Sequence, residues 1–383
     1  MRKHCIVCGE KLIEKPIYVC KNMPAEAQNL PDESNLESDI SMDINLCQCS
    51  GCGLVQFDCE PVSYYKDSTR AGERCQALID LRKQQYTHLI EKYCLQGKKI
   101  LEVGAGKGGF LKTLKEMSEY SIQVYGIENN PEFVNIACEV EGVNVQLGDS
   151  ECMETQIKGA PFDAFVSFAY PARLIEPNSM LQLVSKHLTD NAVGLVQVPS
   201  LEHLLKPGGY FDITRDHIAY YNEATLKFLL RKNGFDILEF GEVSELYIYA
   251  IVKKRMPYDL HTIWGDVAPL TDSVRKYVDK NTRDGKKLAV WCAGHFAFTV
   301  LALVETGSKI SYIIDNAEFK KGHYAPVSHV PITGPEHFRD EPVDTILILG
   351  PIYIDEIIKE IKEKCGTIVK IAAMDKRGLY EIE

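Results

Sequence analysis

Apolar residues recur at regular spacings through the middle of the chain and predict a helix followed by alternating strands and helices. Over residues 76–93 they fall at helical intervals, which predicts one helix. Residues 98–103 form a short apolar run that predicts a strand, residues 104–109 are glycine-rich, and a second helical pattern begins at Phe110. A strand, a glycine turn and a helix in this order are typical of the first βα unit of a nucleotide-binding sheet.

Further apolar runs extend this sheet, at residues 123–128, 145–147, 162–168 and 193–199. The first ends in Glu128, a carboxylate suited to accept both hydroxyls of a ribose. The second is followed by Asp149, which marks either a cofactor contact or an ordinary surface turn. A glycine turn at Gly294 and an apolar run that ends at Asp315 predict a second α/β sheet near the C-terminus.

The length of 383 residues predicts two or three domains, because one hydrophobic core rarely extends past about 250–300 residues. The chain is 45% hydrophobic and 25% charged, and no apolar run approaches the roughly 20 residues of a membrane span, which argues against a membrane protein. The polar N-terminus lacks the pattern of a secretory signal, so we expect a cytoplasmic protein. The net charge of -11 argues against a nucleic-acid partner but is compatible with a local pocket for a phosphorylated small molecule.

Seven of the 13 cysteines lie in the first 59 residues. Disulfides do not persist in a reducing cytoplasm, so clustered thiols indicate a metal site. Cys5 and Cys8 form one Cys-x-x-Cys knuckle and Cys49 and Cys52 form another, each followed by a glycine that suits a sharp turn. Four thiolates complete a tetrahedral zinc shell and leave no place for water, which predicts a structural zinc.

The other clustered cysteines have different expectations. Cys47 is an alternative ligand to Cys49, although the two-residue spacing favours Cys49. Cys20 and Cys59 are expected to be buried as small apolar side chains. The polar, turn-rich residues 29–39 between the knuckles predict a loop.

The glycine segment fits two kinds of cofactor. Gly104-x-Gly106-x-x-Gly109 satisfies the dinucleotide fingerprint, so an NAD-dependent oxidoreductase is one alternative. Glu102 extends the motif to Glu-x-Gly-x-Gly-x-Gly, which resembles the first motif of class I S-adenosylmethionine-dependent methyltransferases. An acid there faces the ammonium group of S-adenosylmethionine and would repel a pyrophosphate, which favours S-adenosylmethionine as the cofactor. The residues predicted to bind it are Glu102, Gly104, Ala105, Gly106, Gly108, Glu128 and Asp149.

Three blocks that span nearly the whole chain resemble the sugar C-methyltransferases that act on nucleotide-linked deoxysugars. They are the knuckle module with residues 64–65, the core with residues 198–199, 211–212 and 216–221, and the C-terminal segments 293–295, 312–315, 320–326 and 330–332. The resemblance implies a nucleotide-linked sugar as the small-molecule substrate, held in part by the C-terminal domain. We expect substrate contacts from Tyr64, Tyr65, Arg173, Lys321 and His323, with a solvated loop as the alternative for the last two.

In that family a base removes a proton beside a keto group, and the enolate attacks the sulfonium methyl group. The family's Tyr-His-Glu-His segment is matched here by residues 214–217, which keep the last histidine and a shortened acid. The resemblance implies His217 as the general base, with a pKa near the working pH, Asp216 as its orienting carboxylate and Tyr220 as a further catalytic residue. Adjacent residues of an extended segment point to opposite faces, so Asp216 and His217 need not touch, and a structural histidine is the alternative.

Two further departures from the family concern the substrate. Residues 173–176 and 245–250 replace its His-x-Pro-Asp and Gly-Gly-Ser-Leu-Arg segments. O- or N-methyl transfer to a sugar or another small metabolite therefore stays open, as does a non-catalytic S-adenosylmethionine-binding protein. We expect an α/β protein with a zinc-binding module over residues 1–65, a class I methyltransferase (Rossmann-like) core over 66–255, and a substrate-holding Rossmann-like α/β domain over 256–383.

Overall fold

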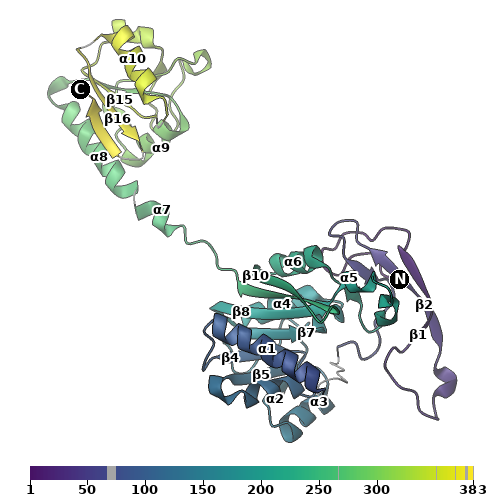
Figure 1. Ribbon diagram of the computed structural model, residues 1–383. Helices are drawn as coiled ribbons and strands as arrows, with labels where there is room; N and C mark the ends of the chain where they lie inside the picture. The colour runs from purple at the N-terminus through teal and green to yellow at the C-terminus, as the bar shows by residue number, and fades with distance from the viewer. Residues whose placement is uncertain (67–74, 266, 351, 367, 376–377, 383) are drawn as a thin grey trace. The chain divides into compact units, whose positions relative to one another are not determined.

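The computed structural model describes residues 1–383 except 67–74, 266, 351, 367, 376–377 and 383. The chain divides into two compact units, Met1–Met256 and Pro257–Glu383 (Figure 1). Every helix in the described part of the chain is too short or too polar to cross a membrane.

A four-stranded sheet carries the N-terminal knuckles. Its order is β1-β2-β3-β9, with β1 (Tyr18–Pro24), β2 (Ser41–Gln48), β3 (Val55–Phe57) and β9 (Ala219–Tyr220). The fourth strand comes from far along the chain, because Tyr220 pairs with Val55 and Ala219 with Gln56. The N-terminal module is therefore joined to the rest of the first unit by backbone hydrogen bonds.

A seven-stranded sheet forms the centre of the first unit, with the order β10-β11-β8-β7-β4-β5-β6. Its strands are β4 (Lys99–Val103), β5 (Gln123–Glu128), β6 (Val145–Leu147), β7 (Phe162–Phe168), β8 (Leu188–Pro199), β10 (Phe235–Val243) and β11 (Tyr247–Lys254). Strands β4 to β8 are parallel, and β11 lies antiparallel between β8 and β10. The chain crosses to opposite sides of β4, so the carboxyl ends of β4, β5 and β7 border the crevice where such sheets bind ligands.

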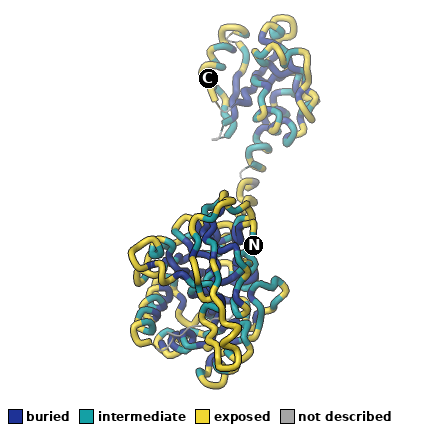
Figure 2. Tube along the Cα trace, turned by 90° about the vertical axis from the view of Figure 1, so that its right-hand side faces the viewer, coloured by how far each residue is buried: buried dark blue, intermediate teal, exposed yellow. Residues whose placement is uncertain are grey.

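Helices cover both faces of this sheet. They are α1 (Gln76–Lys92), α2 (Gly109–Glu116), α3 (Pro131–Asn135), α4 (Pro177–Lys186) and α6 (Glu223–Lys232). The short helix α5 (Leu201–Leu204) packs instead against the core of the N-terminal sheet. α1 and α2 bury Tyr86 and Leu114 against one face, whereas α4 and α6 bury Met180 and Leu226 against the other. Six of the seven residues of β7 are buried, as expected for a strand covered on both sides. Figure 2 shows buried residues in the interior of this unit and exposed residues along its outside.

The second unit contains a six-stranded sheet with the order β14-β13-β12-β15-β16-β17. Its strands are β12 (Leu288–Trp291), β13 (Ile313–Ile314), β14 (Ile332–Thr333), β15 (Thr345–Ile348), β16 (Lys370–Asp375) and β17 (Gly378–Ile382), of which only β17 is antiparallel. Besides α7 (His261–Gly265), its helices are α8 (Val267–Asn281), α9 (His295–Val304) and α10 (Ile354–Cys365). α8 and α9 pack on one face and α10 on the other, so the predicted second Rossmann-like sheet is confirmed.

Most predicted elements of the first unit are confirmed. The helix expected over residues 76–93 is α1, and the five expected strands are β4 to β8. Residues 29–39 form a loop with one 3-10 turn, Leu36–Ser38. The expected extended segment at residues 214–217 is wrong, because the backbone turns there and the His217 amide donates to the Thr214 carbonyl over 3.1 Å.

Candidate functional site

The four knuckle cysteines converge at the edge of the N-terminal sheet. The sulfur atoms of Cys5, Cys8, Cys49 and Cys52 all lie within 4.8 Å of one another. The Sγ atoms of Cys5 and Cys52 are 3.7 Å apart, and those of Cys8 and Cys49 are 3.2 Å apart. Cys47 is outside this group and lies buried on β2.

The local backbone is shaped to surround these sulfurs. The amide groups of Val7, Glu10 and Gly51 donate to the sulfurs of Cys5, Cys8 and Cys49 at 3.3–3.5 Å. Gly9 and Gly53 adopt φ angles of 83° and 81°, as the predicted turns after each knuckle require. Burial opposes ionisation of Cys8, but hydrogen bonds from the Glu10 amide and the Cys49 thiol outweigh it and lower the pKa of Cys8 to about 7. Burial raises the pKa of Cys5 to about 11.

Cys20 and Cys59 behave as predicted. Cys20 is fully buried in the small core beneath the N-terminal sheet, and Cys59 packs against the same core. Burial raises the pKa of both thiols.

The glycine loop after β4 is anchored by the acid at the end of β5. Gly104, Gly106 and Gly108 have φ angles of 72°, 58° and 81°, which favour glycine. One Glu128 oxygen accepts the Gly106 amide at 2.8 Å, and the other accepts the Asn130 amide at 3.1 Å. Glu128 and Glu102 are buried, and Ala105 lies buried within the loop. The structure thus brings the predicted cofactor-binding residues of β4 and β5 together.

Tyr170 packs against the glycine loop and is not among the predicted site residues. It lies two residues after the end of β7, and its ring is so close to the loop that a Cβ atom on Gly104 would be 2.5 Å from it. Its hydroxyl is 3.0 Å from the Ser150 hydroxyl. The available signal was its position at the carboxyl end of a central parallel strand.

The predicted residues Asp149, Tyr65 and Tyr64 take part in protein contacts. Lys66 bonds to Asp149 at 2.5 Å, and the Asp149 side chain is 35% exposed, so both interpretations of Asp149 stay predictions. The Tyr65 hydroxyl donates to Glu151 at 3.2 Å. Tyr64 is 36 residues from Gln28, and its hydroxyl accepts the Gln28 amide at 2.8 Å. Tyr65 therefore lies near Asp149, whereas Tyr64 stabilises the loop between the knuckles.

Asp216 forms a buried ion pair with Arg173. Their Oδ2 and Nη2 atoms are 2.5 Å apart, and the side chains are 0% and 6% exposed. Asp216 also accepts the Thr214 hydroxyl at 2.7 Å and the Gln28 side-chain amide at 2.9 Å. These partners engage the Asp216 carboxylate in place of His217. One Arg173 nitrogen is directed to Asp216, and the substrate contact of Arg173 stays a prediction.

His217 lines a pocket of about 350 Å³, whereas Tyr220 does not. Burial lowers the pKa of His217 to about 4, so the predicted pKa near the working pH is wrong. The Nδ1 atom of His217 has no hydrogen-bond partner among the described residues. Tyr220 is fully buried, and its hydroxyl accepts the Thr214 amide at 3.0 Å, which favours a structural role over the predicted catalytic one.

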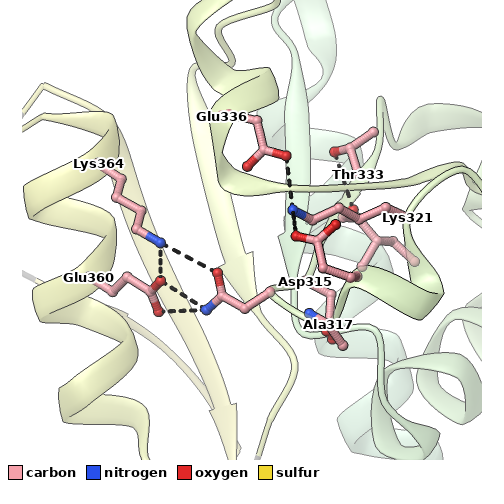
Figure 3. Close-up of polar contacts among 10 residues, drawn as sticks. Asp315, Ala317, Lys321, Thr333, Glu336, Glu360 and Lys364 are labelled. Atoms are coloured by element: carbon pink, nitrogen blue, oxygen red, sulfur yellow. Dashed lines mark hydrogen bonds and ion pairs between the residues drawn. The ribbon is translucent and has the colours of Figure 1, made fainter.

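The predicted basic residues of the second unit line a separate pocket of about 300 Å³. Lys321 bonds to Glu318 at 2.7 Å and to Glu336 at 3.0 Å. Figure 3 shows the contact between Lys321 and Glu336. His323 lies in the same pocket, and its amide donates to the Lys320 carbonyl. Both carboxylates are strongly exposed, at 84% for Glu318 and 66% for Glu336, so the substrate contact and the solvated loop both stay open for Lys321.

Two family models match this chain. Residues 76–239 match a methyltransferase domain, and residues 260–371 match a C-methyltransferase C-terminal domain. The chain belongs to the S-adenosylmethionine-dependent methyltransferases. The predicted class I methyltransferase fold is thereby confirmed, and the methyl donor is favoured over a nicotinamide cofactor.

One distant relative aligns with this chain over most of the length of both proteins. The C-methyltransferase NovU of Streptomyces niveus is 21% identical over 394 residues, which cover 94% of this chain and 92% of that protein. Solved structures similar to this chain include an S-adenosylmethionine-dependent methyltransferase of Clostridium acetobutylicum ATCC 824 (14% identity, TM-score 0.39, 48% of this chain and 96% of that chain). Another is a SAM-dependent methyltransferase of Aquifex aeolicus (19% identity, TM-score 0.37, 46% of this chain and 98% of that chain).

Proposed function

We propose that this methyltransferase transfers a methyl group to a carbon atom beside the keto group of a nucleotide-linked sugar. The observation that carries the proposal is the combination, in one chain, of a methyltransferase domain and a C-methyltransferase C-terminal domain. The C-methyltransferase NovU, which aligns with 94% of the chain, supports the choice of carbon over oxygen or nitrogen.

The glycine loop after β4, with the acids beside it, would bind S-adenosylmethionine. The glycines with positive φ would let the loop backbone approach the cofactor closely. Glu102 and Glu128 supply buried carboxylates at the ends of β4 and β5. Glu102 would face the ammonium group and Glu128 the ribose hydroxyls, while Asp149 would lie near the adenine. The cofactor supplies an electrophilic methyl group.

The chain's own residues would bind the acceptor, exclude water and remove a proton. The pocket that contains His217 lies beside Pro199, at the end of β8, and Tyr247, at the start of β11. Because β8 is parallel to β7, this pocket opens on the same edge of the sheet as the glycine loop. An imidazole in this pocket would take the proton from the acceptor carbon, and alignment of acceptor and methyl donor would supply most of the rate.

The second unit would hold the nucleotide part of the acceptor. Lys321 and His323 line its pocket and would contact the phosphate groups, for which Lys321 would have to exchange a carboxylate partner. We retain Tyr65 as a proposed contact to the substrate. A cytoplasmic location of the protein stays a prediction.

We also propose that the four-cysteine cluster binds a structural zinc ion. In a tetrahedral shell with Zn–S bonds of about 2.3 Å, neighbouring sulfurs lie about 3.8 Å apart. The 3.7 Å distance between the sulfurs of Cys5 and Cys52 fits this value, and the 3.2 Å distance between those of Cys8 and Cys49 would lengthen on binding.

Calorimetric titration with S-adenosylmethionine, S-adenosylhomocysteine and NAD tests the cofactor assignment. We expect binding of the first two and no heat from NAD. A nucleoside-diphosphate-linked keto-deoxyhexose should then gain one methyl group, and carbon-13 NMR with a labelled donor should place it on carbon. A methyl ether or methylamine in the product would refute the proposed C-methylation.

A further inference from the structure

Asp149 lies beside the residues of the proposed cofactor site. It follows β6 by two residues, and β6 pairs in parallel with β5, so Asp149 is on the edge of the sheet that carries Glu128. The amide of its neighbour Gly148 donates to the Glu128 carbonyl over 2.9 Å. The hydroxyl of its other neighbour, Ser150, is 3.0 Å from that of Tyr170, whose ring packs against the glycine loop. These contacts place Asp149 next to the acid proposed to hold the ribose.

Lys66 bridges two carboxylates of this loop. Its Nζ atom is 2.5 Å from Asp149 and 3.4 Å from Glu151, and the Lys66 side chain is 22% exposed. Burial alone would lower the pKa of Lys66, but the bond to Asp149 outweighs it and the pKa is raised, so Lys66 is a cation at neutral pH. Lys66 lies 83 positions before Asp149 in the chain, directly after the predicted zinc-binding module, and is not among the predicted site residues.

The second partner of Lys66, Glu151, is itself held in place. Its side chain is only 5% exposed. Its Oε2 atom accepts the Tyr65 hydroxyl at 3.2 Å, and its Oε1 atom accepts the Glu176 amide at 2.5 Å. Glu176 immediately precedes α4. The Lys66 ammonium group is therefore bonded to a loop that is anchored to the start of a core helix.

The Asp149 carboxylate keeps acceptor capacity for a ligand. Its Oδ2 atom accepts Lys66, and its Oδ1 atom accepts the Glu151 amide at 2.9 Å. An ionised carboxylate has about four lone-pair sites, two on each oxygen, so each oxygen retains one. With 35% of its side chain exposed, Asp149 can accept a donor from outside the protein. Lys66 and the loop amide together fix the direction in which these sites point.

We propose that Lys66 is a positioning residue that holds the Asp149 carboxylate ready for the 6-amino group of the cofactor's adenine. This assignment rests on the proposed cofactor site. The amino group is a hydrogen-bond donor, and an ionised carboxylate only accepts. A carboxylate already held by a cation and an amide loses less freedom on binding than an unrestrained one, so more of the new hydrogen bond appears as affinity. Lys66 acts through Asp149 and does not touch the cofactor.

Selectivity for the 6-amino group tests this role. Calorimetry on the full-length protein compares S-adenosylhomocysteine with S-inosylhomocysteine, in which a 6-oxo group replaces the amino group. Wild type should prefer S-adenosylhomocysteine, because an oxygen that faces Asp149 cannot donate. Lys66→Met should weaken binding of S-adenosylhomocysteine about tenfold, the weight of one hydrogen bond to a charged group, and should weaken S-inosylhomocysteine much less. Lys66→Arg keeps the cation and should keep most of the selectivity.

The chain offers a matched control in Lys309, whose Nζ atom is 2.6 Å from Asp279 in the second unit. Lys309→Met should bind both ligands as wild type does. Both ligands titrate the same folded fraction, so partial unfolding of a variant leaves the ratio of their affinities unchanged.

Three results would overturn the assignment of Lys66. Wild-type selectivity in Lys66→Met would show that Lys66 does not position Asp149. An equal loss of both ligands would indicate a contact that only stabilises the fold, and tighter binding of S-adenosylhomocysteine would show that Lys66 competes with the adenine. A wild-type protein that binds neither ligand would instead refute the proposed cofactor site.

Discussion

Replacing Arg173 by methionine should destabilise the first unit strongly. Asp216 is fully buried, and the substitution removes the cation 2.5 Å from its carboxylate. Breaking a buried ion pair from one side costs about 3–5 kcal/mol. The hydrogen bonds from Thr214 and Gln28 remain, so we expect the lower end, about 3 kcal/mol. For a unit of this size that corresponds to a fall in melting temperature of about 6–12 °C.

Differential scanning calorimetry and urea unfolding measure this loss. A control is Lys21→Met, which breaks an ion pair with Asp43 whose side chains are 73% and 51% exposed and should cost less than about 1 kcal/mol. Asp216→Asn combined with Arg173→Met should recover much of the stability, since no charge is left buried. The reasoning fails if Arg173→Met costs no more than Lys21→Met, or if the double variant is no more stable than the single one.

Three other predictions concern the pocket, the glycine loop and the cysteine cluster. Because burial lowers the pKa of His217 from 6.5 to about 4, the unfolded chain binds this proton more readily, so stability should fall by about 3 kcal/mol from pH 6.5 to 4. Urea unfolding should show a flatter profile for His217→Gln; an unchanged slope would contradict the burial. Gly104→Ala should weaken S-adenosylmethionine binding at least about tenfold in calorimetry, since it strains a φ of 72° and meets the Tyr170 ring; equal affinity would place the cofactor elsewhere. Metal analysis should find one zinc per chain, lost in Cys8→Ser but retained in the exposed-cysteine control Cys138→Ser; equal zinc contents would exclude the cluster.

The parts of the site that were predictable are those encoded over short distances in the sequence. The positions of the glycine loop and Glu128 follow from the order of strand, turn, helix and strand in the sequence. Parallel strands bring their carboxyl ends to the same edge of a sheet. The cysteine knuckles are equally local, and their glycines have the expected backbone conformation.

The pairing of charged side chains was not predictable in this way. Asp216 is adjacent to His217 in the sequence but bonds to Arg173, which lies 43 residues earlier. Lys66 reaches Asp149 across 83 residues. Such partners are determined by tertiary packing, which periodicity does not describe. The turn at residues 214–217 was missed for the same reason, since the buried Tyr220 hydroxyl holds the Thr214 backbone.

The pairing of β3 with β9 has a consequence for how the protein is made. Val55 emerges from the ribosome long before Tyr220, so the N-terminal sheet waits for its fourth strand until β4 to β8 have been synthesised. Contacts of such large sequence separation form late and slowly. We therefore expect a chain truncated before residue 219 to leave the edge of β3 unpaired and exposed to aggregation.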